Sequence, residues 1–328
     1  MTTLRIPVIA LALAGVAFLQ RPEARTAASS AGATESRIRA GDASLYVRSI
    51  GAGRPLIVLH GGPDFDMGYL LPEMDRLKDA FRLVYYDQRG RGKSARGVKP
   101  EDVTLASEVA DLDRVRRQAR LESTALLGHS WGALLALEYA RRHPERVSRL
   151  ILMNPAPVST ADLDAFRRAY AWQLGADMDR QRAIVESPAY KAGDPETVYA
   201  RYRLHFEHAL ARPADFEQLM AKMRAGFVSQ GRDGILKARA VEDRLMQDTW
   251  RADGYDLLPA LRTLRIPTLV IAGDHDFIPL DIPTHIAEGM PDAQLVTLKD
   301  CGHFAYMECA ADVHAVVSGF FGRAPARR

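Results

Sequence analysis

Six short apolar runs recur along the chain, and each of them ends in a turn. They occupy residues 56–59, 83–86, 124–127, 150–153, 269–271 and 295–298. Polar and apolar residues do not alternate within these runs, which is typical of strands covered on both faces of a parallel sheet. Helical patterns lie between them, such as the apolar face formed by Leu105, Val109 and Leu112. This alternation predicts an α/β fold with a doubly wound, mostly parallel sheet.

The same pattern suggests how the chain is organised. Residues 36–40 and 45–49 precede the first run and predict an opening antiparallel hairpin. Between residues 158 and 262 no strand-like run occurs and aromatic residues are frequent. We expect a helical cap there, lying over the carboxyl edge of the sheet, where α/β proteins form ligand sites. A separate helical domain packed elsewhere is the alternative. The expected core is therefore residues 34–157 and 263–328, with a cap at 158–262.

The first 33 residues have the pattern of an export signal. Arg5 gives a positive start, an apolar run follows from residue 6 to 19, and Ala31-Gly32-Ala33 fits a cleavage site. The apolar run is shorter than the roughly 20 residues that span a bilayer. We expect a periplasmic or secreted protein without stable membrane insertion; an uncleaved anchor is the alternative. In an oxidising compartment Cys301 and Cys309 could pair, although their spacing decides nothing about geometry.

Composition excludes several classes of protein. The chain has 328 residues, of which 47% are hydrophobic, so disorder is excluded for most of its length. With 44 Lys and Arg against 41 Asp and Glu, a basic nucleic-acid binder is not expected. Two cysteines cannot build a Cys-rich zinc site, and His205 and His208 lack the accompanying carboxylates of a metal motif. We expect neither a metal nor a cofactor.

The segment Gly128-His129-Ser130-Trp131-Gly132 matches the G-x-S-x-G pattern, with an apolar run before it and an apolar helix after it. A nucleophilic serine on a sharp strand-to-helix turn needs neighbours without side chains two residues away. The N-terminus of the following helix also favours negative charge. We predict that Ser130 is a nucleophile; a structural serine in a tight turn is the alternative.

The segment His60-Gly61-Gly62-Pro63 follows the first long apolar run and predicts an oxyanion hole. Acyl transfer builds negative charge on a carbonyl oxygen, which two backbone N–H groups can stabilise. We expect one donor from Trp131, directly after the serine. The other should be Gly62, with Gly61 as the alternative, because glycine permits close backbone approach. An ordinary strand-ending turn would explain the segment without any role in chemistry.

A serine nucleophile needs a base, and the base needs an orienting acid. The run at 269–271 leads into Asp274-His275-Asp276, and both aspartates are candidates for the acid. We favour Asp276, because Asp274 sits at the strand end, where its side chain more naturally caps the turn. His303 follows the last run, where the base of such a triad belongs. The predicted catalytic set is Ser130, Asp276 and His303.

These segments resemble the α/β-hydrolase superfamily, and within it the proline iminopeptidase branch. The resemblance covers about residues 36–322 and is carried by four motifs. They are His60-Gly61-Gly62-Pro63, the D-Q-R-G-x-G-x-S segment at residues 87–94, the Ser130 motif, and Gly302-His303. The resemblance implies an α/β-hydrolase fold with a helical cap and cleavage of an N-terminal residue, often proline, from a peptide.

The resemblance also implies a binding site for the substrate amine. Glutamates on the cap hold the free amine in that family, and the Phe206-Glu207 step resembles its aromatic-glutamate step. Glu207 is therefore predicted to bind substrate. Two positions depart from the family pattern: Asp64 stands where another glycine usually follows the turn, and His129 where a second glycine often begins the serine motif.

Three functions remain open on the sequence. The first is a serine hydrolase acting as an aminopeptidase on a small-molecule or short-peptide substrate with N-terminal proline or another small residue. The second is a carboxylesterase or other acyl hydrolase that uses the same residues. The third is a ligand-binding protein of the same fold without turnover, although such a protein has no need of a serine, an acid and a histidine together. An amine-binding site requires desolvated carboxylates near the pocket, which would separate the first two.

Overall fold

The computed structural model of the protein describes residues 32–322. The predicted export signal at residues 1–33 falls almost wholly outside this range. Among the described residues, no helix has the length and apolar character required to cross a bilayer.

One sheet of eight strands forms the centre of the described structure, in the order β1-β2-β4-β3-β5-β6-β7-β8. The strands are β1 Thr34–Ala40, β2 Ala43–Ile50, β3 Arg54–Leu59, β4 Phe81–Tyr86, β5 Thr124–His129, β6 Val147–Met153, β7 Thr268–Gly273 and β8 Ala293–Leu298. β2 pairs antiparallel with β1 and β4, and every other neighbouring pair is parallel. The six apolar runs lie within β3 to β8, and the opening hairpin is β1–β2, so the predicted α/β fold is confirmed.

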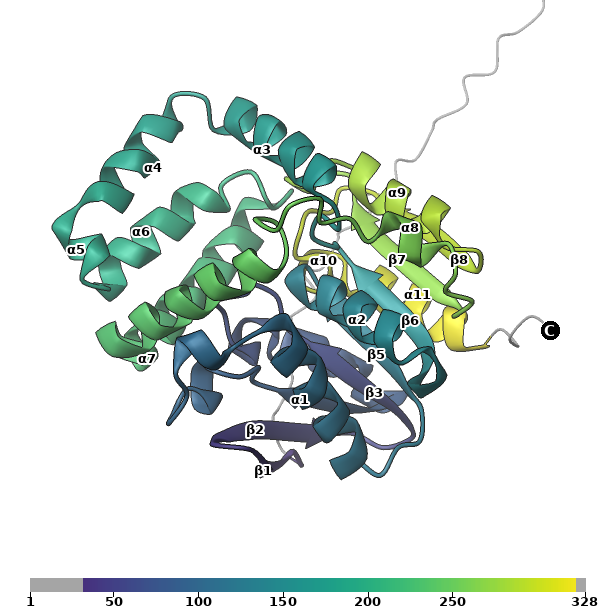
Figure 1. Ribbon diagram of the computed structural model, residues 1–328. Helices are drawn as coiled ribbons and strands as arrows, with labels where there is room; N and C mark the ends of the chain where they lie inside the picture. The colour runs from purple at the N-terminus through teal and green to yellow at the C-terminus, as the bar shows by residue number, and fades with distance from the viewer. Residues whose placement is uncertain (1–31, 323–328) are drawn as a thin grey trace, which may run out of the picture.

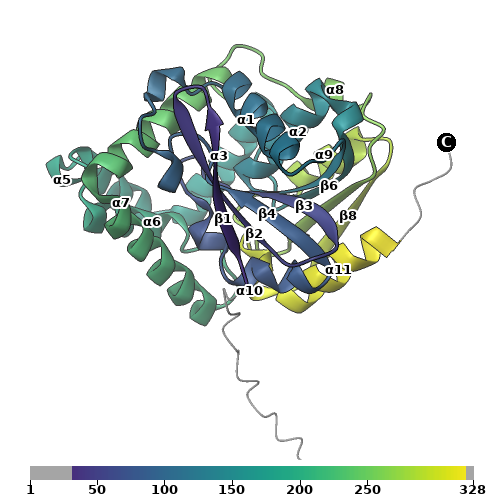
Figure 2. The same ribbon diagram turned by 90° about the horizontal axis from the view of Figure 1, so that it is seen from below.

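Helices cover both faces of the sheet. The α1 (Leu105–Gln118), α2 (Trp131–Arg142) and α9 (Asp281–Gly289) helices lie against one face, and α11 (Ala310–Gly322) lies against the other (Figure 2). The strand residues alternate between the two sides: Leu56 and Val58 belong to one buried apolar cluster, and Ile57 and Leu59 to the other. Burial on both faces explains why the strands are continuous apolar runs.

Besides the single-turn helices α8 (Leu258–Leu261) and α10 (Ala305–Glu308), the described structure contains helices α3 to α7, which lie together on one side of the sheet (Figure 1). They are α3 Thr160–Leu174, α4 Asp177–Glu186, α5 Pro188–Lys191, α6 Pro195–His205 and α7 Pro213–Asp248. We call them the cap helices. α7 bends at Gly231, whose φ of 64° and ψ of −179° interrupt the helical conformation. Glycine adopts this backbone without the Cβ clash that other residues meet.

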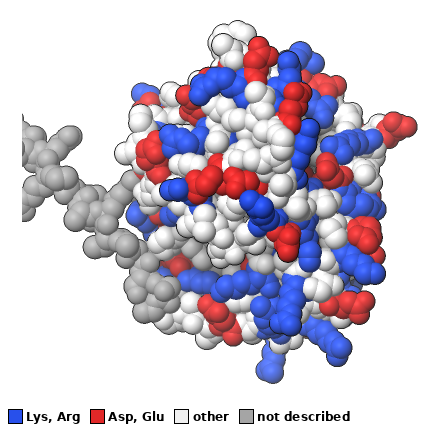
Figure 3. Space-filling view, turned by 90° about the vertical axis from the view of Figure 1, so that its left-hand side faces the viewer, with Lys and Arg blue, Asp and Glu red and all other residues white. Residues whose placement is uncertain are grey.

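The outer face of the cap helices is charged but mixed in sign. Lys and Arg side chains are interspersed with Asp and Glu over this face (Figure 3). Exposed pairs join α6 to α7 here, such as Arg203 with Glu217 at 2.7 Å and Arg224 with Glu196 at 3.0 Å. Each exposed pair contributes little stability by itself. Apolar side chains on the inner side of α6 and α7, such as Val198, Leu219 and Met220, are buried in the same apolar cluster as Leu56 and Val58 of β3.

Candidate active site

Ser130 lies on the sharp turn between β5 and α2. Its φ of 55° places it in the left-handed region, which non-glycine residues seldom occupy. The turn requires glycine on both sides: a Cβ on Gly128 would lie 2.2 Å from the Gly132 carbonyl oxygen, and one on Gly132 would lie 2.3 Å from that of Leu59. Strain held in this way is typical of functional sites. The turn therefore presents Ser130 at the carboxyl edge of the sheet.

Two backbone segments beside Ser130 form the predicted oxyanion hole. Trp131 is the first residue of α2, where backbone N–H groups have no partner within the helix. On the other side, Gly62 has a φ of 121° and lines the same cavity as Ser130. The N–H of Gly61 is already used, because it donates to the Tyr69 hydroxyl at 2.7 Å. This bond favours Gly62 over Gly61 as the second donor.

His303 contacts Asp276, the favoured one of the two aspartates. Its Nδ1 atom lies 2.9 and 3.0 Å from the two carboxylate oxygens of Asp276. Both side chains are almost fully buried, with 3% and 5% of their surface exposed. Asp274 has other partners: it pairs with His275 at 2.7 Å and accepts the Cys301 N–H at 3.2 Å. The structure thus brings His303 and Asp276 together and leaves Asp274 at the turn.

A chain of hydrogen bonds connects the glycine turn to the backbone of His303. His129 Nε2 donates to the His303 carbonyl oxygen at 2.9 Å. Burial and the neighbouring His303 hold the pKa of His129 well below its usual value, so its ring is neutral and Nδ1 accepts. The Tyr69 hydroxyl donates to that Nδ1 at 2.8 Å and accepts from Gly61 N–H. Nothing in the sequence indicates that Tyr69 takes part in this chain of hydrogen bonds.

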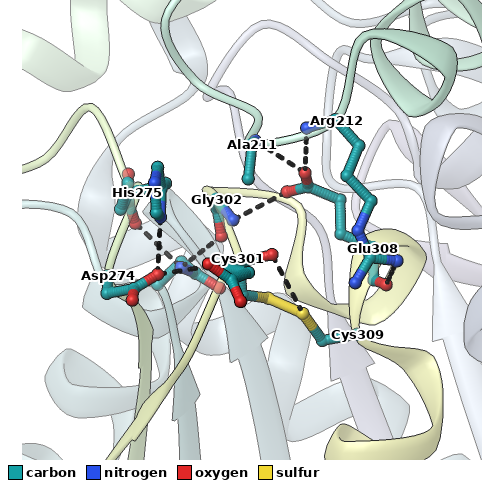
Figure 4. Close-up of a disulfide and its surroundings, with 11 residues drawn as sticks. Ala211, Arg212, Asp274, His275, Cys301, Gly302, Glu308 and Cys309 are labelled. Carbon is teal, nitrogen blue, oxygen red and sulfur yellow. Dashed lines mark hydrogen bonds and ion pairs between the residues drawn. A yellow bond between two sulfur atoms is a disulfide. The ribbon is translucent and has the colours of Figure 1, made fainter.

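The loop that carries His303 is also attached to the cap helices. Glu308 is buried, and its carboxylate accepts the N–H groups of Gly302 at 2.8 Å, Ala211 at 2.7 Å and Arg212 at 3.1 Å (Figure 4). Ala211 and Arg212 lie in the connection between α6 and α7. The Glu308 side chain therefore joins this connection to Gly302, the residue before His303. The His303 N–H itself donates to the Ala209 carbonyl oxygen at 2.6 Å.

A disulfide between Cys301 and Cys309 closes the same loop (Figure 4). Cys301 lies two residues before His303, and Cys309 lies directly before α11. The sequence spacing alone left this pairing open. The disulfide and the Glu308 hydrogen bonds therefore constrain the backbone on both sides of His303.

The D-Q-R-G segment at residues 87–90 holds the glycine turn through hydrogen bonds to His60. Gln88 N–H donates to His60 Nε2 at 3.0 Å, and the Gln88 side chain donates to the His60 carbonyl oxygen at 2.8 Å. Burial lowers the pKa of His60 to about 3, so its ring is neutral and can accept. Asp87 accepts the N–H groups of Met67 at 3.1 Å and Lys93 at 2.8 Å. Neither Asp87 nor Gln88 lines the cavity, which suits a structural role.

One cavity of about 280 Å³ lies between the sheet edge and the cap helices, and it contains Ser130 and His303. Its wall is mostly apolar and aromatic, with Phe166, Phe206 and Phe277 among the lining side chains. The ionisable side chains on the wall that come from outside the triad are Asp64, Arg167, Tyr69, Tyr170, Arg201, Tyr202, His129, His205 and Glu242. A small cavity with a mainly apolar surface and polar side chains among its lining residues is typical of a ligand site.

Two carboxylates line this cavity, the buried Asp64 and the half-buried Glu242, and sequence reasoning assigned neither of them to it. Asp64 follows the glycine turn and accepts a hydrogen bond from the Tyr202 hydroxyl. Burial raises its pKa. Glu242 comes from α7; burial and the negative charge of Asp64 raise its pKa to about 8. The sequence offered one sign of the Asp64 carboxylate, because this residue stands where the family motif usually has another glycine.

The prediction for Glu207 needs correction. Its side chain is exposed, and it is not among the residues that line the cavity. α6 ends at His205, and Phe206 is buried against the aromatic wall, so the chain turns and the next residue points outward. Phe206 and His205 do line the cavity. The aromatic-glutamate step therefore contributes its aromatic residue and not its carboxylate.

One group of side chains has the spacing of a metal site. Asp274, His275 and Asp300 lie close enough to share an ion, but all three are exposed and none lines the cavity. We assign them no role in the site.

The comparisons with known proteins agree with this geometry. Residues 54–310 match the family model described as alpha/beta hydrolase fold, so the chain belongs to the α/β-hydrolase family of enzymes. It is 31% identical to 2-hydroxymuconate semialdehyde hydrolase of a Pseudomonas species, covering 84% of this chain and 89% of that protein. It is 30% identical to a probable proline iminopeptidase of Streptomyces coelicolor, covering 77% and 83%.

A solved structure gives the same result. The proline iminopeptidase of Mycobacterium smegmatis superimposes with a TM-score of 0.64 and 25% identity, covering 88% of this chain and 98% of that one. Relatives with different substrates are thus similar to this chain to about the same degree. Hydrolase activity follows from the family, whereas the substrate has to be argued from the cavity.

Proposed function

We propose that this chain is a serine hydrolase that forms an acyl-enzyme on Ser130. The observation that carries the proposal is the 2.9 Å contact of His303 with Asp276, because His303 lines the same cavity as Ser130. A histidine oriented by a buried carboxylate beside a strained serine is the arrangement that acyl transfer uses on unrelated folds. A protein that only binds its ligand has no need of the combination.

The mechanism that we propose assigns one role to each of these groups. Asp276 accepts the Nδ1 proton of His303, which leaves Nε2 able to take the proton of the Ser130 hydroxyl. Ser130 Oγ then bonds to the substrate carbonyl carbon, and the carbonyl oxygen gains negative charge beside the N–H groups of Gly62 and Trp131. Collapse of this intermediate expels the leaving group, which takes the proton from His303. Water repeats the cycle and releases the acyl group.

For the substrate, we propose a peptide with N-terminal proline or another small residue. Two supports are the proline iminopeptidase names among the relatives and the carboxylate of Asp64 on the cavity wall. Asp64 is well placed to bind the amine. A Cβ atom built on Gly62 would lie 3.3 Å from Asp64 Oδ1, so this carboxylate oxygen lies beside the turn that carries the oxyanion donor. The α-amine of an N-terminal residue is one carbon away from the reacting carbonyl. Asp64 takes the role first predicted for Glu207.

An acyl hydrolase acting on esters is the second candidate. The aromatic wall of Phe166, Phe206 and Phe277 favours it, because such a wall binds an apolar acyl group without needing an amine. A panel of aminoacyl-naphthylamides and short-chain nitrophenyl esters separates the two candidates. Turnover of prolyl- or alanyl-naphthylamide but not of its acetylated form supports the aminopeptidase. Preferred turnover of simple esters, with no gain from a free amine, supports the esterase.

Export to the periplasm or outside the cell is a further part of the proposal. It rests on the sequence pattern of residues 1–33, and the Cys301–Cys309 disulfide suits an oxidising compartment. N-terminal sequencing of the protein recovered from cell fractions tests it. A chain that keeps Met1 and remains with the cytoplasmic fraction would contradict export.

A further inference from the structure

Arg201 is a charged side chain on the cavity wall that has no ion-pair partner among the described residues. It comes from α6, lines the cavity together with Ser130, and its Nε atom is buried without a hydrogen-bond partner. Among residues 32–322, no carboxylate lies within salt-bridge distance of its guanidinium group. The guanidinium group lies over the Tyr202 ring, with 4.4 Å between the guanidinium carbon and the ring centroid. A guanidinium is always charged and offers five donors.

Arg201 is half-buried as a residue, but a charged donor such as its Nε atom is costly to bury without a partner unless something compensates it. The face of the Tyr202 ring attracts the positive charge of Arg201. It does not accept hydrogen bonds from the N–H groups of the guanidinium, which point outward in the guanidinium plane. The two carboxylates on the cavity wall, Asp64 and Glu242, form no direct ion pair with Arg201. Asp64 accepts the Tyr202 hydroxyl, and Glu242 makes no salt bridge with Arg201. Burial and the Asp64 charge raise the pKa of Glu242 to about 8, so below that pH Glu242 is mostly neutral.

We propose that Arg201 binds a carboxylate of the substrate. A planar carboxylate matches the guanidinium fork and can accept two parallel hydrogen bonds, which a hydroxyl or an amide oxygen cannot do equally well. The anion would enter the cavity with the substrate, and it would satisfy donors that the free protein leaves unpaired.

This inference deepens the proposed function and rests on it for the identity of the substrate. A peptide held by its amine at Asp64 and by a carboxylate at Arg201 is a short one with a free C-terminus. The cavity volume of about 280 Å³ is slightly below the roughly 300–1,000 Å³ usual for ligand sites, which favours such a small molecule. The substrate class is therefore a dipeptide or similarly short peptide, and not the end of a long chain.

Four ligands distinguish the contribution of the amine to binding from that of the carboxylate. They are prolyl-alanine, prolyl-alaninamide and the N-acetylated form of each. Their affinities are measured by calorimetry or ligand-observed NMR on the Ser130→Ala protein, which binds without turnover. The comparison of acid with amide reports on Arg201, whereas the comparison of free with acetylated amine reports on the proposed aminopeptidase function.

Three further variants, each combined with Ser130→Ala, locate the effect. Arg201→Gln removes the charge, and Arg201→Lys keeps it without the planar fork. Arg203→Gln is the matched control, because Arg203 lies on the same helix but pairs with Glu217 on the outer face. Circular dichroism and thermal unfolding check that each variant folds.

We expect both acids to bind about 10- to 100-fold more tightly than their amides, the usual range for hydrogen bonds to charged groups. The preference should persist in Arg203→Gln, decrease in Arg201→Lys and disappear in Arg201→Gln. Equal affinity for acids and amides in the Ser130→Ala protein would overturn the inference even if the Arg201 variants fail to fold. So would a preference that survives Arg201→Gln, or no binding by any of the four ligands. Acid preference without any effect of acetylation would instead reject the aminopeptidase and keep the role of Arg201.

Discussion

The side chain of Asn154 donates a hydrogen bond of 2.8 Å to Asp276, on the carboxylate oxygen Oδ2. The same Nδ2 atom lies 3.2 Å from the Gly302 carbonyl oxygen, so Asn154 joins the ends of β6, β7 and β8. Asn154 has a φ of 48°, a conformation that asparagine tolerates better than most residues. The backbone N–H of Ile278 donates to the other oxygen of Asp276 at 2.9 Å. The carboxylate that faces His303 is thus held from both sides.

This arrangement predicts different results for the two aspartates. Asp276→Asn should lower kcat by about 10⁴, because an amide in place of the carboxylate holds His303 in the wrong tautomer. Asp274→Asn is the matched control, since Asp274 binds His275 and the Cys301 N–H at the turn. It should lower kcat far less. Steady-state kinetics on both variants measures the difference, and the reverse order would assign the acid to Asp274.

Replacing the nucleophile should abolish turnover and spare the fold. Ser130→Ala is expected to lower kcat by about 10⁶, the typical loss when a serine nucleophile is removed. The Ser130 backbone N–H, which donates to the Met153 carbonyl oxygen at 3.0 Å, is kept in the variant. Kinetics and thermal unfolding are measured together. A variant that keeps most of its activity and a parental melting curve would remove Ser130 from the mechanism.

The parts of the fold that sequence predicts well are those with a local cause. β3 to β8 are continuous apolar runs because both of their faces are covered, and that pattern is visible without any knowledge of neighbours. The Ser130 turn and the glycine turn are equally local, because their backbone geometry requires glycine at fixed positions. His303 follows from its place after the last strand.

The cavity wall could not be predicted in the same way. Asp64, Arg201 and Glu242 come from three different elements and meet only when the cap helices pack against the sheet edge. No spacing in the sequence relates them. Glu207 shows the opposite error: its motif is local, but the residue at which α6 ends decides which way its side chain points. Tyr69 and Asn154 escaped notice for a similar reason, since each acts through a partner that is distant in the sequence.

Glu308 should matter for both stability and activity. Its carboxylate accepts three backbone N–H groups, whereas a glutamine would present an NH₂ group to at least one of them. Glu308→Gln should lower the free energy of unfolding by about 2–4 kcal/mol, because a buried donor is left unpaired. It should also reduce kcat about tenfold, with a smaller change in KM, because the loop before His303 loosens.

Chemical denaturation and steady-state kinetics check this prediction for Glu308. The control is Glu145→Gln, a change at an exposed carboxylate that pairs only with its neighbour Arg146. That variant should stay within about 0.5 kcal/mol of the parent. Parental stability and kcat in Glu308→Gln would show that the hydrogen bonds from Ala211, Arg212 and Gly302 do not position His303.

The preference for a carboxylate should depend on the protonation of Glu242. Burial and the negative charge of Asp64 raise the pKa of this side chain to about 8, so it is mostly neutral below that pH and anionic above it. The charges that act on it are Asp64 beside the glycine turn, Arg201 on α6, and Asp243 and Arg239 on α7. An anionic Glu242 would neutralise part of the Arg201 charge and repel a second carboxylate.

We therefore expect the ratio of kcat/KM for prolyl-alanine to that for prolyl-alaninamide to fall as pH rises through about 8. Both peptides carry a free amine that titrates in the same range, so the parent profile alone is not sufficient. Glu242→Gln supplies the comparison, because it keeps the size of the side chain and cannot ionise. Its ratio should change with pH only as far as the substrates' own titration requires. Identical pH profiles for parent and Glu242→Gln would show that the charge of Glu242 does not affect ligand binding at Arg201, whereas a flatter profile in the variant would support an electrostatic influence of Glu242 on Arg201.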